Sequence, residues 1–244
     1  MQLKDLIAPL YLRRMTASPR GRAFILNQAA DSEDSDEGTI FSSLLSRIDD
    51  DKLRKMVRIH EADEKRHAVM FRECAERAGV DYETLPQHMM LLDRLDKALD
   101  GFFDKFVAGE AGVMEAYVLL QVIEERAVTQ FKMLEPAFRR VDPRTADVFL
   151  AIARDEERHL KYCRAISKRY APDEATLTRT LRHYRNVEAQ VFVEHSQGMM
   201  EFALDSGILG SGPIETRFWR GISRLAKRAG RPDHTPFSEP ALQT

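Results

Sequence analysis

The sequence has few of the residues that mark several large classes of protein. Its 244 residues include two cysteines, Cys74 and Cys163, too few for a disulfide framework, so a reducing, cytoplasmic environment is expected. No apolar run approaches the roughly 20 residues of a membrane span. A net charge of −2 argues against general nucleic-acid binding. The first residues, Met1–Asp5, lack the layout of a signal peptide.

Glycine and proline are also scarce, with 12 and 10 residues, whereas 43% of the chain is hydrophobic and 31% is charged. This balance is typical of a soluble, helix-rich protein. Helical periodicity predicts an all-α fold. The expected helices cover about 21–48, 51–78, 109–139, 143–170, 173–206 and a basic, amphipathic 214–229. A further helical segment at about 87–107 makes the second connection long, which favours a crossover running along a helix bundle.

Two short motifs stand out on these helices. Glu64-Lys65-Arg66-His67 and Glu156-Glu157-Arg158-His159 both read Glu-x-x-His. On a helix, positions i and i+3 lie on one face, so each motif aims a carboxylate and an imidazole in the same direction. Both motifs interrupt apolar stripes, and a buried carboxylate or histidine is costly unless it is paired or bound to metal. The two motifs therefore predict a metal site.

Four-helix bundles that hold two metal ions combine two such motifs with one glutamate from each of the other two helices. In the second hairpin the turn is centred near Arg140. Glu124 lies 16 residues before Arg140 and Glu156 lies 16 residues after it, so the two are level. Glu125 leaves the apolar stripe. We therefore expect Glu124 to be the ligand from the third helix.

The first hairpin turns near Asp50. Glu37 lies 13 residues before Asp50 and Glu64 lies 14 after it, which makes them level at about 1.5 Å per residue. Glu33 lies 17 residues before Asp50, about one turn too high. The register favours Glu37 over Glu33, although the acidic run 31–37 alone resembles a solvated loop. The predicted metal ligands are Glu37, Glu64, His67, Glu124, Glu156 and His159.

Two neighbours of these ligands have alternative interpretations. His60 lies one turn before Glu64 on the same face. It is either a hydrogen-bond donor to a ligand carboxylate or a satisfied core histidine. Tyr117, two turns before Glu124, is interpreted as core packing rather than as part of the site.

The two Glu-x-x-His motifs, with Glu124 and an acid upstream, resemble the ferritin-like, rubrerythrin-like diiron-carboxylate superfamily over residues 20–170. The resemblance implies an antiparallel four-helix bundle with a central dimetal site, here with additional C-terminal helices. The chain has no Cys-x-x-Cys pair for a rubredoxin iron. The expected organisation is a lead-in at 1–19, the bundle at 20–170, helices packed on it at 171–230 and a flexible tail at 231–244.

The same resemblance implies an oxidoreductase with two iron ions, or manganese or mixed manganese and iron. It would activate O2 or peroxide and oxidise a small organic substrate with the help of an electron donor. The alternatives are an iron-handling ferroxidase and a helical binding module with a structural metal. Nucleic acid is not expected as a partner, and no membrane-spanning segment is expected. The oligomeric state stays open, with a homodimer as one candidate.

Overall fold

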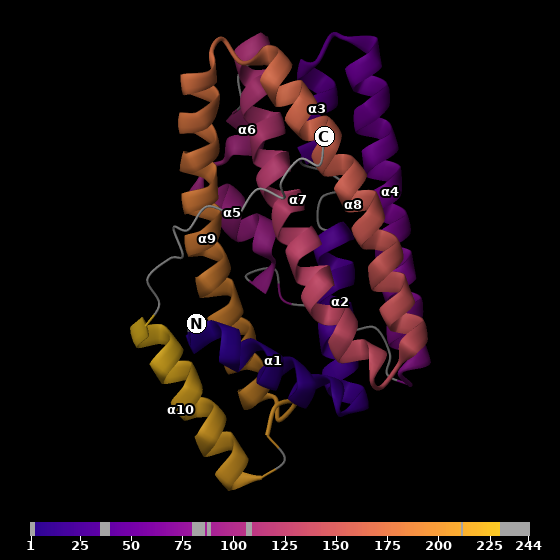
Figure 1. Cartoon of the computed structure of the whole chain (residues 1–244), viewed down its shortest axis with the longest axis vertical. Coiled ribbons are helices and arrows are strands. Elements are labelled where there is room, and N and C mark those ends of the chain that lie inside the picture. Colours follow the sequence, from indigo (N-terminus) through magenta and orange to yellow (C-terminus); the bar gives the residue numbers. More distant parts are fainter. Residues whose placement is uncertain are drawn as a thin grey trace, which may run out of the picture.

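Every regular element in the described part of the chain is a helix. The computed structural model describes residues 3–34, 40–79, 86, 89–105, 109–210 and 212–229, in which ten helices follow one another (Figure 1). The predicted all-α fold class is confirmed for these residues. None of the described helices combines the length and the apolar character needed to cross a membrane.

The four longest helices are α4 (Asp51–Arg77), α7 (Glu110–Arg139), α8 (Pro143–Tyr170) and α9 (Glu174–Asp205). Three of them begin at an aspartate whose side chain accepts backbone N–H groups of the first turn. These N-cap residues are Asp50, Asp142 and Asp173. Such caps satisfy amides that have no partner within the helix. The predicted boundaries of these four helices are confirmed to within two residues.

The first predicted helix corresponds to two described helices. They are α2 (Pro19–Asp34) and α3 (Ile40–Arg47), and α1 (Leu3–Thr16) precedes them. Residues 35–39, which would join α2 and α3 and include Glu37, lie outside the described residues. Helix α2 packs along α4, as the predicted hairpin requires.

The segment predicted to be helical over 87–107 is helical in its described part, but it is not one continuous helix. The described part of this segment forms α5 (Leu91–Ala98) and α6 (Phe102–Lys105). Between them, Asp100 and Gly101 have φ angles of 57° and 73°. Positive φ values interrupt a right-handed helix, and glycine accepts them at little steric cost. The carboxylate of Asp96 then accepts the amide of Phe103 at 3.1 Å, which helps α6 to begin.

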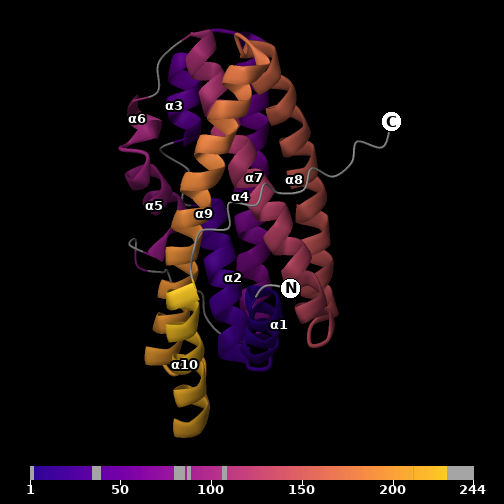
Figure 2. The same ribbon diagram turned by 60° about the vertical axis from the view of Figure 1, so that its left-hand side comes forward.

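The long helices run along the long axis of the molecule (Figure 1). Helices α7 and α8 form a closely packed hairpin, and α9 packs beside α7. Helices α1 and α10 (Pro213–Ala229) lie at one end, with α3 and α6 at the other, as the turned view also shows (Figure 2).

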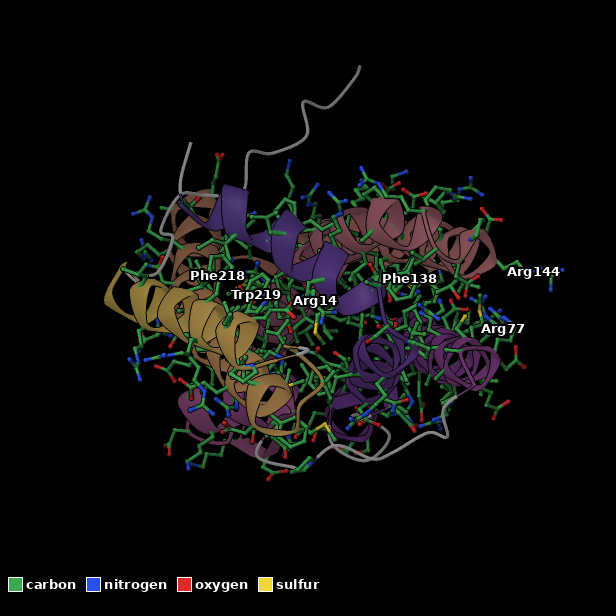
Figure 3. The ribbon with its side chains drawn as sticks, turned by 90° about the horizontal axis from the view of Figure 1, so that it is seen from below. Arg14, Arg77, Phe138, Arg144, Phe218 and Trp219 are labelled. Carbon is green, nitrogen blue, oxygen red and sulfur yellow. The ribbon has the colours of Figure 1, made fainter. Side chains whose placement is uncertain are left out.

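At the α1 end, the final helix packs through its tryptophan. Trp219 is 5% exposed, and its ring meets Tyr11 of α1 edge-on at 6.1 Å. Arg14 and Glu215 form a salt bridge beside it, with Nη2 3.1 Å from Oε2. Trp219 and Arg14 lie between the two helices in the end-on view (Figure 3). The predicted tail at 231–244 lies outside the described residues.

The buried side chains of the described residues form two apolar clusters between the helices. One contains Ile40, Val57, Tyr117, Val122 and Cys163 among others. The second contains Leu26, Ala30, Phe71, Phe131 and Ile152 among others. On α4, α7 and α8, the interval between the two clusters is where buried acids and histidines occur, and on α2 Glu33 follows the second cluster directly. The fold thus places a polar layer between two apolar cores, where water has little access.

Candidate metal centre

Seven polar side chains from four helices converge in this layer. Helix α2 contributes Glu33, α7 contributes Glu124, and α4 and α8 contribute the two Glu-x-x-His motifs. The seventh is His60, one turn before Glu64. The ligand atoms fall into two groups, within each of which all lie within 4.8 Å of one another. The first group is His60, Glu64, Glu124 and His159. The second is Glu33, Glu64, His67 and Glu156.

The first group is centred on carboxylate oxygens of two helices. Nε2 of His60 lies 3.0 Å from Oε1 of Glu64 and 2.9 Å from Oε1 of Glu124. Nδ1 of His159 lies 3.3 Å from the same Glu64 oxygen. His60, Glu124 and His159 are all at least 95% buried. Helices α4, α7 and α8 therefore direct these four side chains to one point.

The second group has the same design around His67. Its Nδ1 lies 3.0 Å from Oε1 of Glu156, 3.3 Å from Oε2 of Glu33 and 3.9 Å from Oε2 of Glu64. Glu64 thus has one oxygen in each group. A carboxylate that faces two sites in this way can bridge two metal ions about 3.5–4 Å apart.

Two oxygen atoms show that the groups suit a cation. Oε1 of Glu64 and Oε1 of Glu156 are buried and accept no hydrogen bond from the described residues, although imidazole nitrogens lie about 3 Å away. An unsatisfied buried acceptor costs free energy, and more when it carries charge. Nitrogen and oxygen atoms that converge in this way, with two acceptors left unsatisfied, have the arrangement of ligands around a common metal ion. The residues present therefore fit a metal.

The electrostatics of the layer lead to the same conclusion. Burial, and then the nearby carboxylates of Glu64 and Glu156, raise the pKa of Glu33 and of Glu124 well above the usual range. Burial alone would lower the pKa of His67, but Glu156 and Glu33 raise it to about 11. Without metal, the layer holds protons to offset the repulsion between acids. A cation would replace those protons.

A ring of four charged residues surrounds the two motif histidines. Each motif extends to Asp-Glu-x-Arg-His, as Asp63 precedes Glu64 and Asp155 precedes Glu156. Nε2 of His67 donates to Asp155 at 3.4 Å, and Nε2 of His159 donates to Asp63 at 3.2 Å. Each aspartate thus holds the histidine of the opposite helix. This contact fixes the ring orientation and leaves Nδ1 facing the carboxylates.

Two arginines close the ring. Arg66 donates to Asp63 and Asp155 at 2.8 Å each. Arg158 donates to Asp155 at 2.8 Å and to Asp63 at 2.7 Å. The two motifs are therefore joined by a pseudo-symmetric network of charged hydrogen bonds, which holds α4 and α8 at a fixed separation.

The structure brings together five of the six predicted ligands. Glu64, His67, Glu124, Glu156 and His159 are all in the layer, whereas Glu37 lies outside the described residues. Glu33, which the register placed one turn too high, is in the second group. It lies 17 residues before Asp50, and His67 lies 17 after it, so Glu33 is level with His67 rather than with Glu64.

Sequence reasoning left His60 undecided and did not single out the aspartates. The repeated Asp-Glu-x-Arg-His pattern was a signal for the ring, because Asp and Arg recur at the same offsets in both motifs. Glu125, which was set aside because it leaves the apolar stripe, is in neither ligand group and binds Arg185 through two hydrogen bonds of 2.8 and 2.6 Å. Buried His and Glu groups that could hold a metal ion are thus present where the motifs predicted them.

Comparisons with known proteins do not add to this description. No protein-family model matches the chain, and searches of curated proteins and of solved structures gave no match.

Proposed function

We propose that the chain is a ferritin-like four-helix bundle with additional C-terminal helices, and that it functions as a diiron oxidoreductase. The observation that carries this proposal is the pair of ligand groups that share Glu64 inside a buried polar layer. Four carboxylates balance the charge of two divalent ions, and imidazoles complete the ligand set. Carboxylate and imidazole together suit iron or manganese. Structural zinc sites are instead usually rich in cysteine.

A bound pair of iron ions would supply the electrons that reduce O2 or peroxide. The protein contributes the environment for that chemistry. Asp63 and Asp155 hold the imidazoles of His159 and His67 in the orientation in which Nδ1 faces the carboxylates. The two apolar clusters keep bulk water away, which strengthens electrostatic interactions in the layer.

The additional helices favour an enzyme that acts on a small organic substrate over a simple storage subunit. Helix α9 is fixed to α7 by Arg126, whose Nε and Nη2 bind the carboxylate of Glu188 at 2.7 and 2.8 Å. Helix α5 packs on α9 in turn. These elements pack on the side of α7 that carries Glu125 and Arg126, and a plain iron-storage bundle would not need them.

Metal analysis combined with spectroscopy tests the proposal. Protein loaded with ferrous iron without oxygen should contain two irons per chain, and exposure to O2 should produce the optical and Mössbauer spectra of a coupled diferric pair. Glu64→Ala should abolish both signals. Glu125→Gln changes a buried acid that follows Glu124 but is in neither ligand group, and it should retain them. Binding of one iron or none, or spectra of isolated ions, would contradict a diiron centre.

A further inference from the structure

We infer that His60 is a metal ligand oriented by Tyr162, and that the two metal positions therefore differ in nitrogen content and fill in order. The inference rests on the proposed metal centre and specifies its two positions. It starts from His60 because this residue lies outside both Glu-x-x-His motifs and yet reaches the centre of the first ligand group.

The contacts of His60 differ from those of an ordinary buried histidine. Its Nε2 lies almost equally far from carboxylate oxygens of two helices, 3.0 Å from Glu64 and 2.9 Å from Glu124. A single N–H group cannot be directed well at both, and Oε1 of Glu64 accepts no hydrogen bond within the described part of the chain. The ring also lies 4.0 Å from that of His159, centroid to centroid. Nε2 of His60 is thus placed as one of four ligand atoms around a shared ion.

The opposite side of the ring is held by a tyrosine. Nδ1 of His60 is hydrogen-bonded to the hydroxyl of Tyr162, which lies three residues after His159 on α8. Phe41 packs against His60 with ring centroids 5.0 Å apart. With Nδ1 bonded and the ring held by its neighbours, Nε2 faces the carboxylates. Tyr162 is therefore a positioning residue, because it acts on the metal through His60.

The two positions then have unlike donors. The first receives two imidazoles, from His60 and His159, and the carboxylates of Glu64 and Glu124. The second receives one imidazole, from His67, and three carboxylates, from Glu33, Glu64 and Glu156. Imidazole favours cobalt, iron and zinc over manganese, whereas oxygen ligands suit manganese well. The first position should bind cobalt or iron more tightly and fill first, and the second should tolerate manganese.

Titration of the metal-free full-length protein with Co2+ tests the inference. Calorimetry should resolve two binding steps of unequal affinity, and the visible bands of bound Co2+ should identify the first step. His60→Gln should weaken the tighter step by about 100-fold or more and change its visible spectrum, while the second step persists. Tyr162→Phe keeps the ring but removes its partner, and should weaken the tighter step by about tenfold.

Tyr117→Phe is the matched control. Tyr117 is a second buried tyrosine of the same region, its ring centroid 6.5 Å from that of Tyr162, and its hydroxyl has no hydrogen-bond partner among the residues that the structure describes. This variant should leave both steps unchanged. Melting of each metal-free variant, followed by circular dichroism, establishes that it is folded. If His60→Gln does not fold, Tyr162→Phe carries the test.

Two equal binding steps in the wild type, or an unchanged first step and spectrum in folded His60→Gln, would overturn the inference. With His60→Gln unfolded, an unchanged first step in Tyr162→Phe would do the same. Failure of the proposed metal centre gives a different result, in which Co2+ binds no more tightly to the wild type than to Glu64→Ala.

Discussion

Glu124 and Glu125 are neighbours on α7, both buried, yet they lie in opposite kinds of environment. Glu125 accepts hydrogen bonds from Arg185, from Arg164 at 3.2 Å and from Gln121 at 3.0 Å. Burial would raise the pKa of Glu125, but Arg185 lowers it below the usual range. Among the described residues, no arginine or lysine forms an ion pair with Glu124. Its pKa is raised by burial and by nearby carboxylates.

The same contrast extends to the other acids. Glu188 on α9 has a bidentate partner in Arg126, and so it resembles Glu125. Glu33, Glu64 and Glu156 resemble Glu124, since within the described residues histidines are their only cationic partners. Where buried acids tie helices together, the chain provides guanidinium groups. Where it omits them, protons or an external cation can supply the charge, and the polar layer is such a place.

The largest expected effect is a difference in metal affinity between variants of an acid in the polar layer and of an acid paired with arginine. Glu64→Ala removes the carboxylate that both groups share, and should reduce the affinity for Co2+ by more than about 100-fold, beyond the range for residues that only orient ligands. Glu125→Ala should leave the affinity unchanged, because its carboxylate faces Arg185. Calorimetric titration of both variants measures this difference. An equal loss of affinity in both variants would mean that the contrast between the two environments has no bearing on metal binding.

The next prediction concerns stability without metal, for which the two acids should give opposite signs. Glu125→Gln removes the charge that pairs with the partly buried guanidinium groups of Arg185 and Arg164, and should lower the free energy of unfolding by about 3 kcal/mol. Glu124→Gln removes an acid that is repelled by its neighbours and should raise it by about 0.5–2 kcal/mol. Urea unfolding in the presence of a chelator measures both. A loss of stability in Glu124→Gln would show that its carboxylate is already satisfied in the metal-free protein.

Metal affinity should also depend on pH. His159 has a pKa raised to about 9, because Glu156 and Glu64 outweigh the lowering effect of burial. A protonated imidazole cannot bind metal, so His159, His67 and the acids of raised pKa must release protons on binding. The affinity should therefore rise as the pH increases from 6 to 9, by about tenfold per unit for each proton released. Calorimetry in buffers of different ionisation enthalpy counts the protons. An affinity that does not change with pH would contradict the raised pKa values.

The smallest effect is expected in the ring around the histidines. Asp63→Asn keeps the size of the side chain but weakens its hold on His159, and should lower metal affinity by about tenfold. Glu157→Gln neutralises an acid of the other motif, which is bound to the exposed Lys132 instead of a histidine. It should have no effect on metal affinity in the same titration. If both variants behave alike, the ring contributes only through its overall charge.

Much of this arrangement could be predicted from local sequence. The spacing of Glu64 and His67, and of Glu156 and His159, requires only the helical repeat, and the caps at Asp50 and Asp142 fix where two of the helices begin. The register across the α7–α8 turn was also reliable, because the turn is short and both helices are continuous.

The remaining features depend on tertiary geometry. Comparing positions along the helix axis with Glu64 alone could not select Glu33. Each motif spans about one turn, so an acid of a neighbouring helix can lie level with the histidine instead of the glutamate. The role of His60 depends on Tyr162, which comes from a helix about 100 residues further along the chain. The split between α5 and α6 depends on two residues with positive φ, and of these only Gly101 signals a turn in the sequence.

The central claim is that the acids without arginine partners hold two metal ions. The most direct test is an anomalous difference map, measured at the iron edge from crystals of the protein loaded with ferrous iron without oxygen. We predict two peaks about 3.5–4 Å apart. One should lie among His60, Glu64, Glu124 and His159, and the other among Glu33, Glu64, His67 and Glu156. A map without peaks in this layer, or with peaks only at surface acids, would contradict the account.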